Sequence, residues 1–361
     1  MTLSSRPSTT RAVDDQQSDM LARFDLAWMP SREYRILGRR VSLASNDRSI
    51  LRVCDHLYAA FRAHGRERRG TTSSPASAPR RAGPIQTYLV REGRGGKKTY
   101  LAIDPGFRSF VCDNSSMAVA FWGAQVMVNH LYPLDFLLLH ASVIKIDGEL
   151  LVFLGKGRSG KTTLTIRLIE AGGQFYSDEF APVHIGSGRI HPFPRALLCR
   201  GRVPAALRQG RDGSRYDVFY DHQERDRKQR PVRRWIVPAS SLGVTIATAP
   251  ASAAALFFLG GFSDGRTRIE PLSGARGLQM ILDHIVNPGY VSLRKRRAAV
   301  DALAGLFGGA PAFTLFPGSP DAENSAALGA RLVQAARAGK PDISELEQVA
   351  EKCRLILRSQ A

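Results

Sequence analysis

The sequence predicts an α/β fold, with a mixed-sheet core built on a strand, a glycine-rich loop and a helix, and a small α+β module before it. The apolar run LLVFL at 150–154 leads directly into GKGRSGKT at 155–162. After this loop, Leu164, Leu168 and Ile169 fall along one side of a helix at 162–171. Other apolar runs of strand length lie on both sides of the loop. We therefore expect several strands and helices packed around it.

Length and composition bound the class of protein. The chain has 361 residues, 43% of them hydrophobic, which is ample for two domains. A net charge of +19 is compatible with nucleic acid, an anionic membrane surface or an acidic protein as partner. Much of the excess is arginine in loop-like stretches, so nucleic acid is not favoured. The most apolar stretch, 253–261, is too short to cross a bilayer, and we expect a cytoplasmic protein with no membrane span.

The four cysteines are scattered along the chain, at Cys54, Cys112, Cys199 and Cys353. They form no CxxC pair and no Cys/His cluster at metal-ligand spacing. Neither a zinc site nor a disulfide framework is expected, and the four are interpreted as ordinary reduced cysteines.

Composition divides the chain into four parts. Residues 1–18 are polar without apolar periodicity, which predicts a disordered lead-in. Residues 19–110 are expected to form the N-terminal module, with a basic linker or loop at about 65–84 that is rich in Gly, Ser, Pro and Arg. Residues 111–320 contain the glycine-rich loop and form the core domain. Residues 321–361 are rich in Ala, Leu, Glu and Arg, which predicts a C-terminal helical region.

Hydrophobic patterns predict the individual elements. The module ends in a helical pattern at 53–61, followed by the strand-like segments QTYLV and KTYLAID and by a buried helix at 118–131. In LLLHASVIKIDGELLVFLG we expect two apolar strands joined by a turn at Asp147-Gly148, and the helix after the glycine-rich loop should stop at Gly172-Gly173. FAPVHIGSGRIHPFPRALL predicts a hairpin around 186–188.

The second half of the core domain begins with a basic segment. From Arg208 to Arg234 the chain carries nine Arg or Lys residues with few apolar anchors, which predicts an exposed excursion that could dock an acidic acceptor or simply solvate a loop. WIVPASSLGVTIA and AAALFFLGGF then predict strands, and a helix is expected from about Ala275.

The small residues of the glycine-rich loop predict phosphate binding. Glycines let the backbone curl so that successive N–H groups face a phosphate, and the helix after the loop adds the positive end of its dipole. We expect Lys161 to reach the β- and γ-phosphates and the Thr162 hydroxyl to ligate magnesium. The loop therefore predicts a site for ATP with Mg²⁺. Its predicted binding residues are Gly155, Gly157, Arg158, Ser159, Gly160, Lys161, Thr162 and Thr163.

Two acids follow the next predicted strand, GQFYS. Asp178 and Glu179 come directly after it, and strand ends at one sheet edge meet in the same ligand crevice. A carboxylate there could meet the metal or the attacking hydroxyl, so the pair could divide metal binding and proton acceptance. Which acid has which role is undetermined, and a pair of solvated turn acids is the alternative.

A histidine and an arginine are further candidates. His140 ends the apolar run at 137–139, from where it could approach the γ-phosphate; the alternative is a satisfied core histidine. Arg195 follows Pro192-Phe193-Pro194, a stiff segment able to hold a guanidinium against phosphate. Its alternative is one more surface arginine in a basic chain.

LLLHASVIKIDGELLVFLGKGRSGKTTLTIRLIEAGGQFYSDEFAPV resembles the kinase core of the HPr kinase/phosphorylase superfamily, especially its HPr-kinase-related serine kinase branch. The resemblance covers about 137–198 and continues more weakly through FFLGGFSDGRTRIEPLSGARGL. It implies a mixed α/β P-loop core similar to phosphoenolpyruvate carboxykinase. It also implies that Lys161 and Thr162 handle phosphate and magnesium and that Asp178 is the leading candidate for catalytic base. Glu179 would help at the metal, His140 would line the site and Arg195 is favoured as a site residue.

The sequence departs from the bifunctional members of that superfamily. They have an acidic residue after the hydroxyl residue of the P-loop, where this chain has Thr163, and their R-G-x-G phosphorylase signature is echoed only faintly by CRGRVP at 199–204. Phosphorolysis of a phosphoserine is therefore not expected. The resemblance implies an acceptor peptide or small protein, with a PqqD-like peptide-binding protein as a further partner, and a homo-oligomer is expected.

These patterns favour an ATP- and Mg-dependent kinase that transfers the γ-phosphoryl group to a Ser hydroxyl of a peptide or small protein. A small-molecule kinase of a biosynthetic pathway would use the same core. A non-enzymatic nucleotide-gated protein or a nucleic-acid-associated ATPase is supported only by the charge. It predicts nucleic-acid binding with a steep salt dependence and no acceptor phosphorylation.

Overall fold

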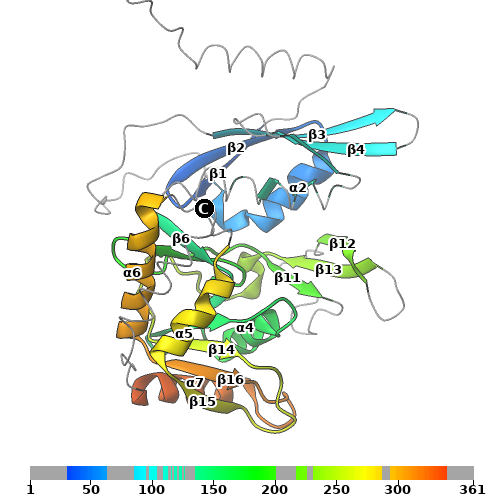
Figure 1. Ribbon diagram of the computed structural model, residues 1–361. Helices are drawn as coiled ribbons and strands as arrows, with labels where there is room; N and C mark the ends of the chain where they lie inside the picture. The colour runs from blue at the N-terminus through cyan, green and yellow to red at the C-terminus, as the bar shows by residue number, and fades with distance from the viewer. Residues whose placement is uncertain are drawn as a thin grey trace, which may run out of the picture. The chain divides into compact units, whose positions relative to one another are not determined.

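The computed structural model describes residues 31–62, 85–94, 97–103, 109–112, a few positions between 115 and 126, and then 135–200, 217–225, 231–286 and 293–339 (Figure 1). The predicted lead-in, the basic loop at 65–84, most of the predicted helix at 118–131, His130 and Cys353 lie outside these residues. The chain divides into two compact units. The first unit comprises 1–55 and 63–126, and the second unit comprises 56–62 and 127–361.

The first unit contains a sheet of strand order β1-β2-β3-β4-β5. Its elements are β1 (Arg32–Ile36), β2 (Arg39–Ser45), α2 (Arg48–Leu57), β3 (Ile85–Arg94), β4 (Lys97–Ile103) and β5 (Ser109–Cys112). β2 and β3 are parallel, and the other neighbours are antiparallel. Asp55 of α2 accepts hydrogen bonds from Arg32 and Tyr34 of β1 at 2.9 and 3.0 Å. These bonds fix the helix against the first strand.

The second unit is built on a mixed six-stranded sheet of order β15-β16-β14-β8-β7-β9. Its strands are β7 (Ala141–Ile146), β8 (Glu149–Leu154), β9 (Gln174–Ser177), β14 (Ala255–Leu259), β15 (Arg268–Leu272) and β16 (Ala312–Phe316). Its helices are α4 (Lys161–Glu170), α5 (Gly274–Ile281), α6 (Leu293–Gly309) and α7 (Ser325–Ala338). The predicted α/β class with a mixed sheet is confirmed. The stop of α4 expected at Gly172-Gly173 and the start of a helix expected near Ala275 are also confirmed.

Helices cover both faces of this sheet. Phe257 of β14 stacks on Phe153 and Phe313 at centroid distances of 5.4 and 5.3 Å, in a core shared with side chains of α4 and α7. Its neighbour Phe258 points to the opposite face, because successive side chains of a strand alternate. There it stacks on Phe307 of α6 at 6.4 Å, and α5 packs against α6 (Figure 1).

Strand direction brings several chain segments to one edge of the sheet. β8, β14 and β16 are parallel, so the loops that follow them, at 155–160, 260–267 and 317–324, leave from the same edge. β7 is antiparallel to β8 and therefore begins at this edge, directly after His140. β9 is antiparallel to β7 and therefore ends there, directly before Asp178.

The apolar segment at 137–146, expected to be one strand, is two. β6 (Phe136–Leu139) pairs antiparallel with β10 (Ala181–His184) in a separate two-stranded sheet, and β7 begins only after His140. His140 interrupts the pattern because its backbone N–H donates to His284 O at 2.7 Å instead of continuing either ladder. The turn expected at Asp147-Gly148 is present, with φ angles of 48° and 88°.

The basic segment from Arg208 to Arg234 is not a plain excursion. It contains β12 (Asp217–Arg225) and part of β13 (Pro231–Val237), which pair antiparallel, and β13 also pairs with β11 (Leu197–Arg200). Val232 and Ile236 are buried, whereas the Arg233 guanidinium lies 4.1 Å from the Trp235 ring centroid on the other face. Side chains of β13 thus alternate between the two faces of the sheet, and Val232 is a buried apolar residue within the basic segment. Residues 201–216 and 226–230 lie outside the described residues.

None of the described helices is long and apolar enough to span a membrane.

We expect Phe257→Ala to lower the free energy of unfolding by about 3–5 kcal/mol, because it removes a fully buried ring and leaves a cavity between two others. Urea unfolding followed by circular dichroism measures this. Phe262→Ala is the matched control, since that ring is 63% exposed and its loss should cost under about 1 kcal/mol. Equal losses at the two positions would contradict the layered core.

Candidate functional site

The loop at 155–160 makes a tight connection between β8 and α4. Arg158 and Gly160 have φ angles of 70° and 94°, in the left-handed region. A Cβ at Gly155 would collide with the Ser159 side chain, and one at Gly160 would lie 2.5 Å from Cζ of Phe262. This loop conformation therefore requires glycine at these two positions.

The first turn of α4 presents unpaired backbone donors. Gly160 is the N-cap residue and provides no side chain, and Leu164 makes the first intrahelical bond, donating to Gly160 O at 2.9 Å. The N–H groups at 161–163 therefore have no partner within the helix. Together with the helix dipole they favour an anion at this end of α4.

Lys161 lies along the loop and is nearly buried. Its ammonium donates to Gly155 O at 2.5 Å and Lys156 O at 3.2 Å. Burial lowers the pKa of Lys161, although Asp178 and Glu179 oppose that shift. The Ser159 hydroxyl is buried and has no hydrogen-bond partner among the described residues. An anion in the loop would give both side chains a stronger partner.

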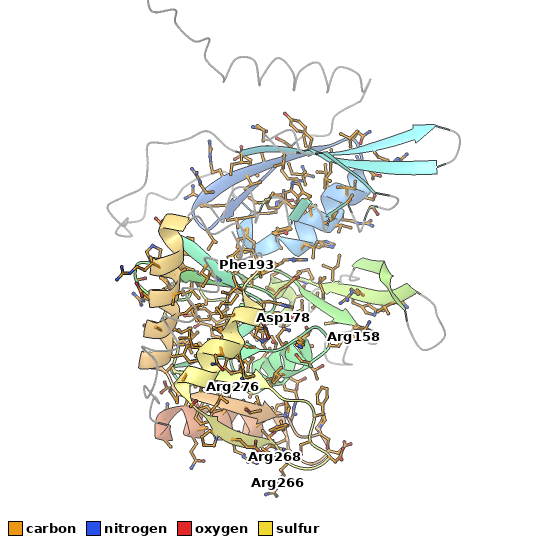
Figure 2. The ribbon with its side chains drawn as sticks, in the orientation of Figure 1. Arg158, Asp178, Phe193, Arg266, Arg268 and Arg276 are labelled. Carbon is orange, nitrogen blue, oxygen red and sulfur yellow. The ribbon has the colours of Figure 1, made fainter. Side chains whose placement is uncertain are left out.

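Asp178, labelled in Figure 2, directly follows β9 and is hydrogen-bonded to α4. Its Oδ2 accepts a hydrogen bond from Thr162 Oγ1 at 2.8 Å, and its Oδ1 accepts one from Thr165 Oγ1 at 2.9 Å. The two threonines are three residues apart and therefore share one face of the helix. A hydroxyl in the first turn of α4 and the carboxylate that directly follows β9 are thus in direct contact.

The protonation of Asp178 is set by burial. Desolvation raises its pKa to about 7, against the lowering effect of the two threonine hydroxyls and of Lys161. Glu179 raises it further through like charge. Near neutral pH the carboxyl is therefore poised between its protonated and ionised forms, which suits a group that exchanges protons.

Glu179, the residue after Asp178, forms an ion pair with Arg195. Arg195 Nη1 lies 2.6 Å from Glu179 Oε2, and its guanidinium lies 5.7 Å from the Tyr58 ring centroid. A turn fixes both acids, because the Ser177 hydroxyl donates to Phe180 O and accepts from Phe180 N. Glu179 lines the cleft described below, whereas Arg195 reaches the site through Glu179.

His140 lies at the start of β7, on the same edge, and is partly buried. Burial lowers its pKa, Lys161 lowers it further and Glu179 opposes both. His284 lies behind it, with its pKa lowered to about 4 by burial and by Lys161 and His140. The two imidazoles are therefore neutral at pH 7 and add no positive charge near Lys161.

These residues surround a cleft of about 1020 Å³, within the range of small-molecule sites. The residues 157–163, His140, Asp178 and Glu179 line it, together with Cys199, Arg200 and Arg234 from the three-stranded sheet. Of the residues predicted from sequence, only Gly155 and Arg195 do not line it; Gly155 contributes the carbonyl that holds Lys161. The structure thus brings the predicted segments together.

The residues at the cleft fit a magnesium ion shared with phosphate. Among the described residues, no group of three or more His, Cys, Asp and Glu side chains could hold a metal by itself. Thr162 and Asp178 nevertheless offer adjacent hard oxygen donors, and magnesium often binds through one or two carboxylates plus substrate phosphates.

Sequence reasoning missed three residues of the site or its supports. Thr165 holds Asp178, and its position three residues after Thr162 could have indicated this. Arg167 of α4 donates to Gly318 O at 2.8 Å and Glu323 O at 2.6 Å, which ties the loop at 317–324 to the helix. Phe262 follows a Gly-Gly pair after an apolar strand, a signal that was present but unused.

Comparison with protein-family models finds no match to this chain. Comparison with curated proteins finds no significant match either.

We expect the stability of the protein to fall as pH rises from about 4 to about 7. An unfolded Asp has a pKa near 3.9, whereas Asp178 titrates at about 7 in the folded state. Between these values the folded state holds a proton that the unfolded state lacks, so unfolding becomes easier as pH rises.

Asp178→Asn should remove this pH-dependent part of the free energy of unfolding, which is worth roughly 1–4 kcal/mol between about pH 4 and pH 7. Melting temperatures measured between pH 4.5 and 8 test it. Glu270→Gln, at an exposed carboxyl, controls for the loss of one charge. If the melting temperatures of wild type and Asp178→Asn changed in parallel with pH, the raised pKa of Asp178 would be contradicted.

Proposed function

We propose that this chain is an ATP- and magnesium-dependent kinase that transfers the γ-phosphoryl group to a hydroxyl, with a serine of a peptide or small protein as acceptor. The observation that carries the proposal is the 2.8 Å hydrogen bond from Thr162 to Asp178, beside Lys161 and the unpaired N–H groups of α4. The resemblance of residues 137–198 to HPr-kinase-related serine kinases supports the same activity and membership.

In this proposal the loop and α4 bind the triphosphate. The N–H groups at 161–163 and the Lys161 ammonium face the phosphates, with Lys161 exchanging its contact to Gly155 O for one to phosphate oxygen. Magnesium, when bound, neutralises charge on the phosphoryl oxygens. Thr162 would hold it, together with whichever of the two acids, Glu179 or Asp178, does not act as the base.

Asp178 is also the leading candidate for the base. Its pKa of about 7 allows the carboxylate to accept the proton of the acceptor hydroxyl at neutral pH and to release it afterwards. Glu179 is fixed by Arg195 and keeps a second negative charge nearby. The neutral imidazole of His140 lines the same cleft and can orient the acceptor by hydrogen bonding.

The far wall of the cleft favours an acidic acceptor. Arg200 of β11 and Arg234 of β13 are opposite each other in the strand register, and both line the cleft. Two arginines in the lining of the cleft are compatible with acidic residues flanking the reacting serine. A peptide or small protein therefore fits this wall, and a PqqD-like peptide-binding protein remains a proposed partner.

Labelled ATP offered to an array of serine-containing peptides, each paired with its Ser→Ala version, tests the activity. We expect label on peptides with acidic residues near serine and none on the Ser→Ala pairs. Failure of the wild-type chain to bind ATP with magnesium would overturn the proposal.

We expect Lys161→Ala to abolish ATP-dependent transfer and to leave a folded protein, because the lysine supplies charge and not core packing. Calorimetric ATP binding and thermal melting measure the two effects. Lys145→Ala is the matched control, since Lys145 lies toward the other end of β7. Wild-type turnover in Lys161→Ala would contradict the phosphate-loop assignment.

For Asp178→Asn we expect ATP binding to persist and transfer to fall by about two orders of magnitude, the scale for losing a positioned base. The wild-type rate should rise with pH through about 7, as Asp178 ionises, and the variant should lose this rise. A collapse of ATP binding would instead assign Asp178 to the metal and make Glu179 the better base, which Glu179→Gln would then test.

A further inference from the structure

Phe262 is an exposed aromatic ring beside the glycine-rich loop. It is the only large hydrophobic side chain that is exposed among the described residues, with 63% of its surface accessible. A phenyl ring that is mostly exposed gains little from burial in the folded chain. Its position next to a candidate ligand site therefore points to a role in binding.

The contact between Phe262 and Gly160 follows from the topology. β8 and β14 are parallel neighbours, so Gly160 and Phe262 leave the same sheet edge. A Cβ at Gly160 would lie 2.5 Å from Cζ and 3.0 Å from Cε1 of the ring. The ring edge thus lies against the residue directly before Lys161, at the start of the proposed phosphate site.

The backbone around Phe262 is anchored. Gly260 N donates to Leu315 O and Ser263 N donates to Pro317 O, both at 2.9 Å, and Ser319 N donates to Gly265 O at 3.2 Å. Gly261 between them has a φ of 120°, which only glycine adopts readily. The backbone is therefore anchored on both sides of Phe262, and this fixes the point from which the ring extends.

A second cavity adjoins the ring. It measures about 340 Å³ and is lined by Gly160, Thr163, Phe262 and residues 317–320. Its size is in the range of small-molecule pockets. Gly160, Thr163, Arg167, Phe262 and Pro320 line both this cavity and the main cleft, so the two adjoin. Asp178, Glu179 and His140 line only the main cleft, which places this cavity on the side away from the proposed acceptor.

We propose that Phe262 is the platform on which the nucleobase stacks, with the ribose and base lying in the cavity between Phe262 and residues 317–320. This rests on the proposed function, because it assumes that a nucleoside triphosphate occupies the loop. A base offers a flat π-face, and stacking on an aromatic side chain strengthens binding without requiring hydrogen bonds to the base. A triphosphate alone would fill the loop and leave Phe262 uncovered.

The test compares two ligands in three proteins. Calorimetry with magnesium measures dissociation constants of ATP and of inorganic tripolyphosphate for wild type, Phe262→Ala and Phe262→Trp. Because stacking acts only on the base, Phe262→Ala should weaken ATP about tenfold or more. It should leave tripolyphosphate binding unchanged, and Phe262→Trp, which keeps an aromatic face, should retain ATP binding.

The outcomes separate this proposal from the proposed function. An equal loss for ATP and tripolyphosphate in Phe262→Ala would make Phe262 a support of the loop at Gly160 and overturn the stacking role. No loss for either ligand would place the base elsewhere. Failure of wild type to bind ATP would overturn both proposals, whereas ATP binding that is insensitive to Phe262→Ala would overturn only this one.

Discussion

The parallel pairing of β8 with β14, and of β14 with β16, is the constraint on which the rest of the second unit depends. It places the three loops after these strands at one sheet edge. The antiparallel strands β7 and β9 then bring His140 and Asp178 to that edge from the other direction. Because the sheet is covered by helices on both faces, the edge is where polar side chains can meet a ligand.

Burial at this edge sets the pKa values of the ionisable side chains there. Asp178 receives two hydroxyl hydrogen bonds, yet desolvation still dominates and raises its pKa to about 7. The same burial lowers the pKa of Lys161 and raises that of the Cys199 thiol to about 12, with Asp178 adding to the second effect. Burial thus disfavours the charged forms of the aspartate, the lysine and the thiol alike.

Arg167 connects the helix to the loop beyond β16. Its guanidinium is buried and donates to two carbonyls at 318 and 323. Glu323, buried beside it, accepts from Thr267 N and pairs with Arg331 of α7. Polar groups that are this deeply buried need hydrogen bonds, which both terminal nitrogens of Arg167 make and which its Nε lacks among the described residues. The loop at 317–324 is therefore held to α4, and the two cavities keep a common wall.

Local patterns in the sequence determined the α/β class, the strand before the glycine-rich loop, the extent of α4 with its glycine stop, and the position of Asp178 and Glu179 after β9. Each depends on periodicity or on a residue with a special backbone role, which neighbours in sequence can encode. They did not determine the break at His140 or the strands within the basic segment, because these depend on backbone pairing with distant residues such as His284 and with β11. Only the tertiary structure placed Thr165 on Asp178 and Phe262 on Gly160. Those contacts join residues on different elements, and strand order and direction, which no single segment encodes, decide which elements meet.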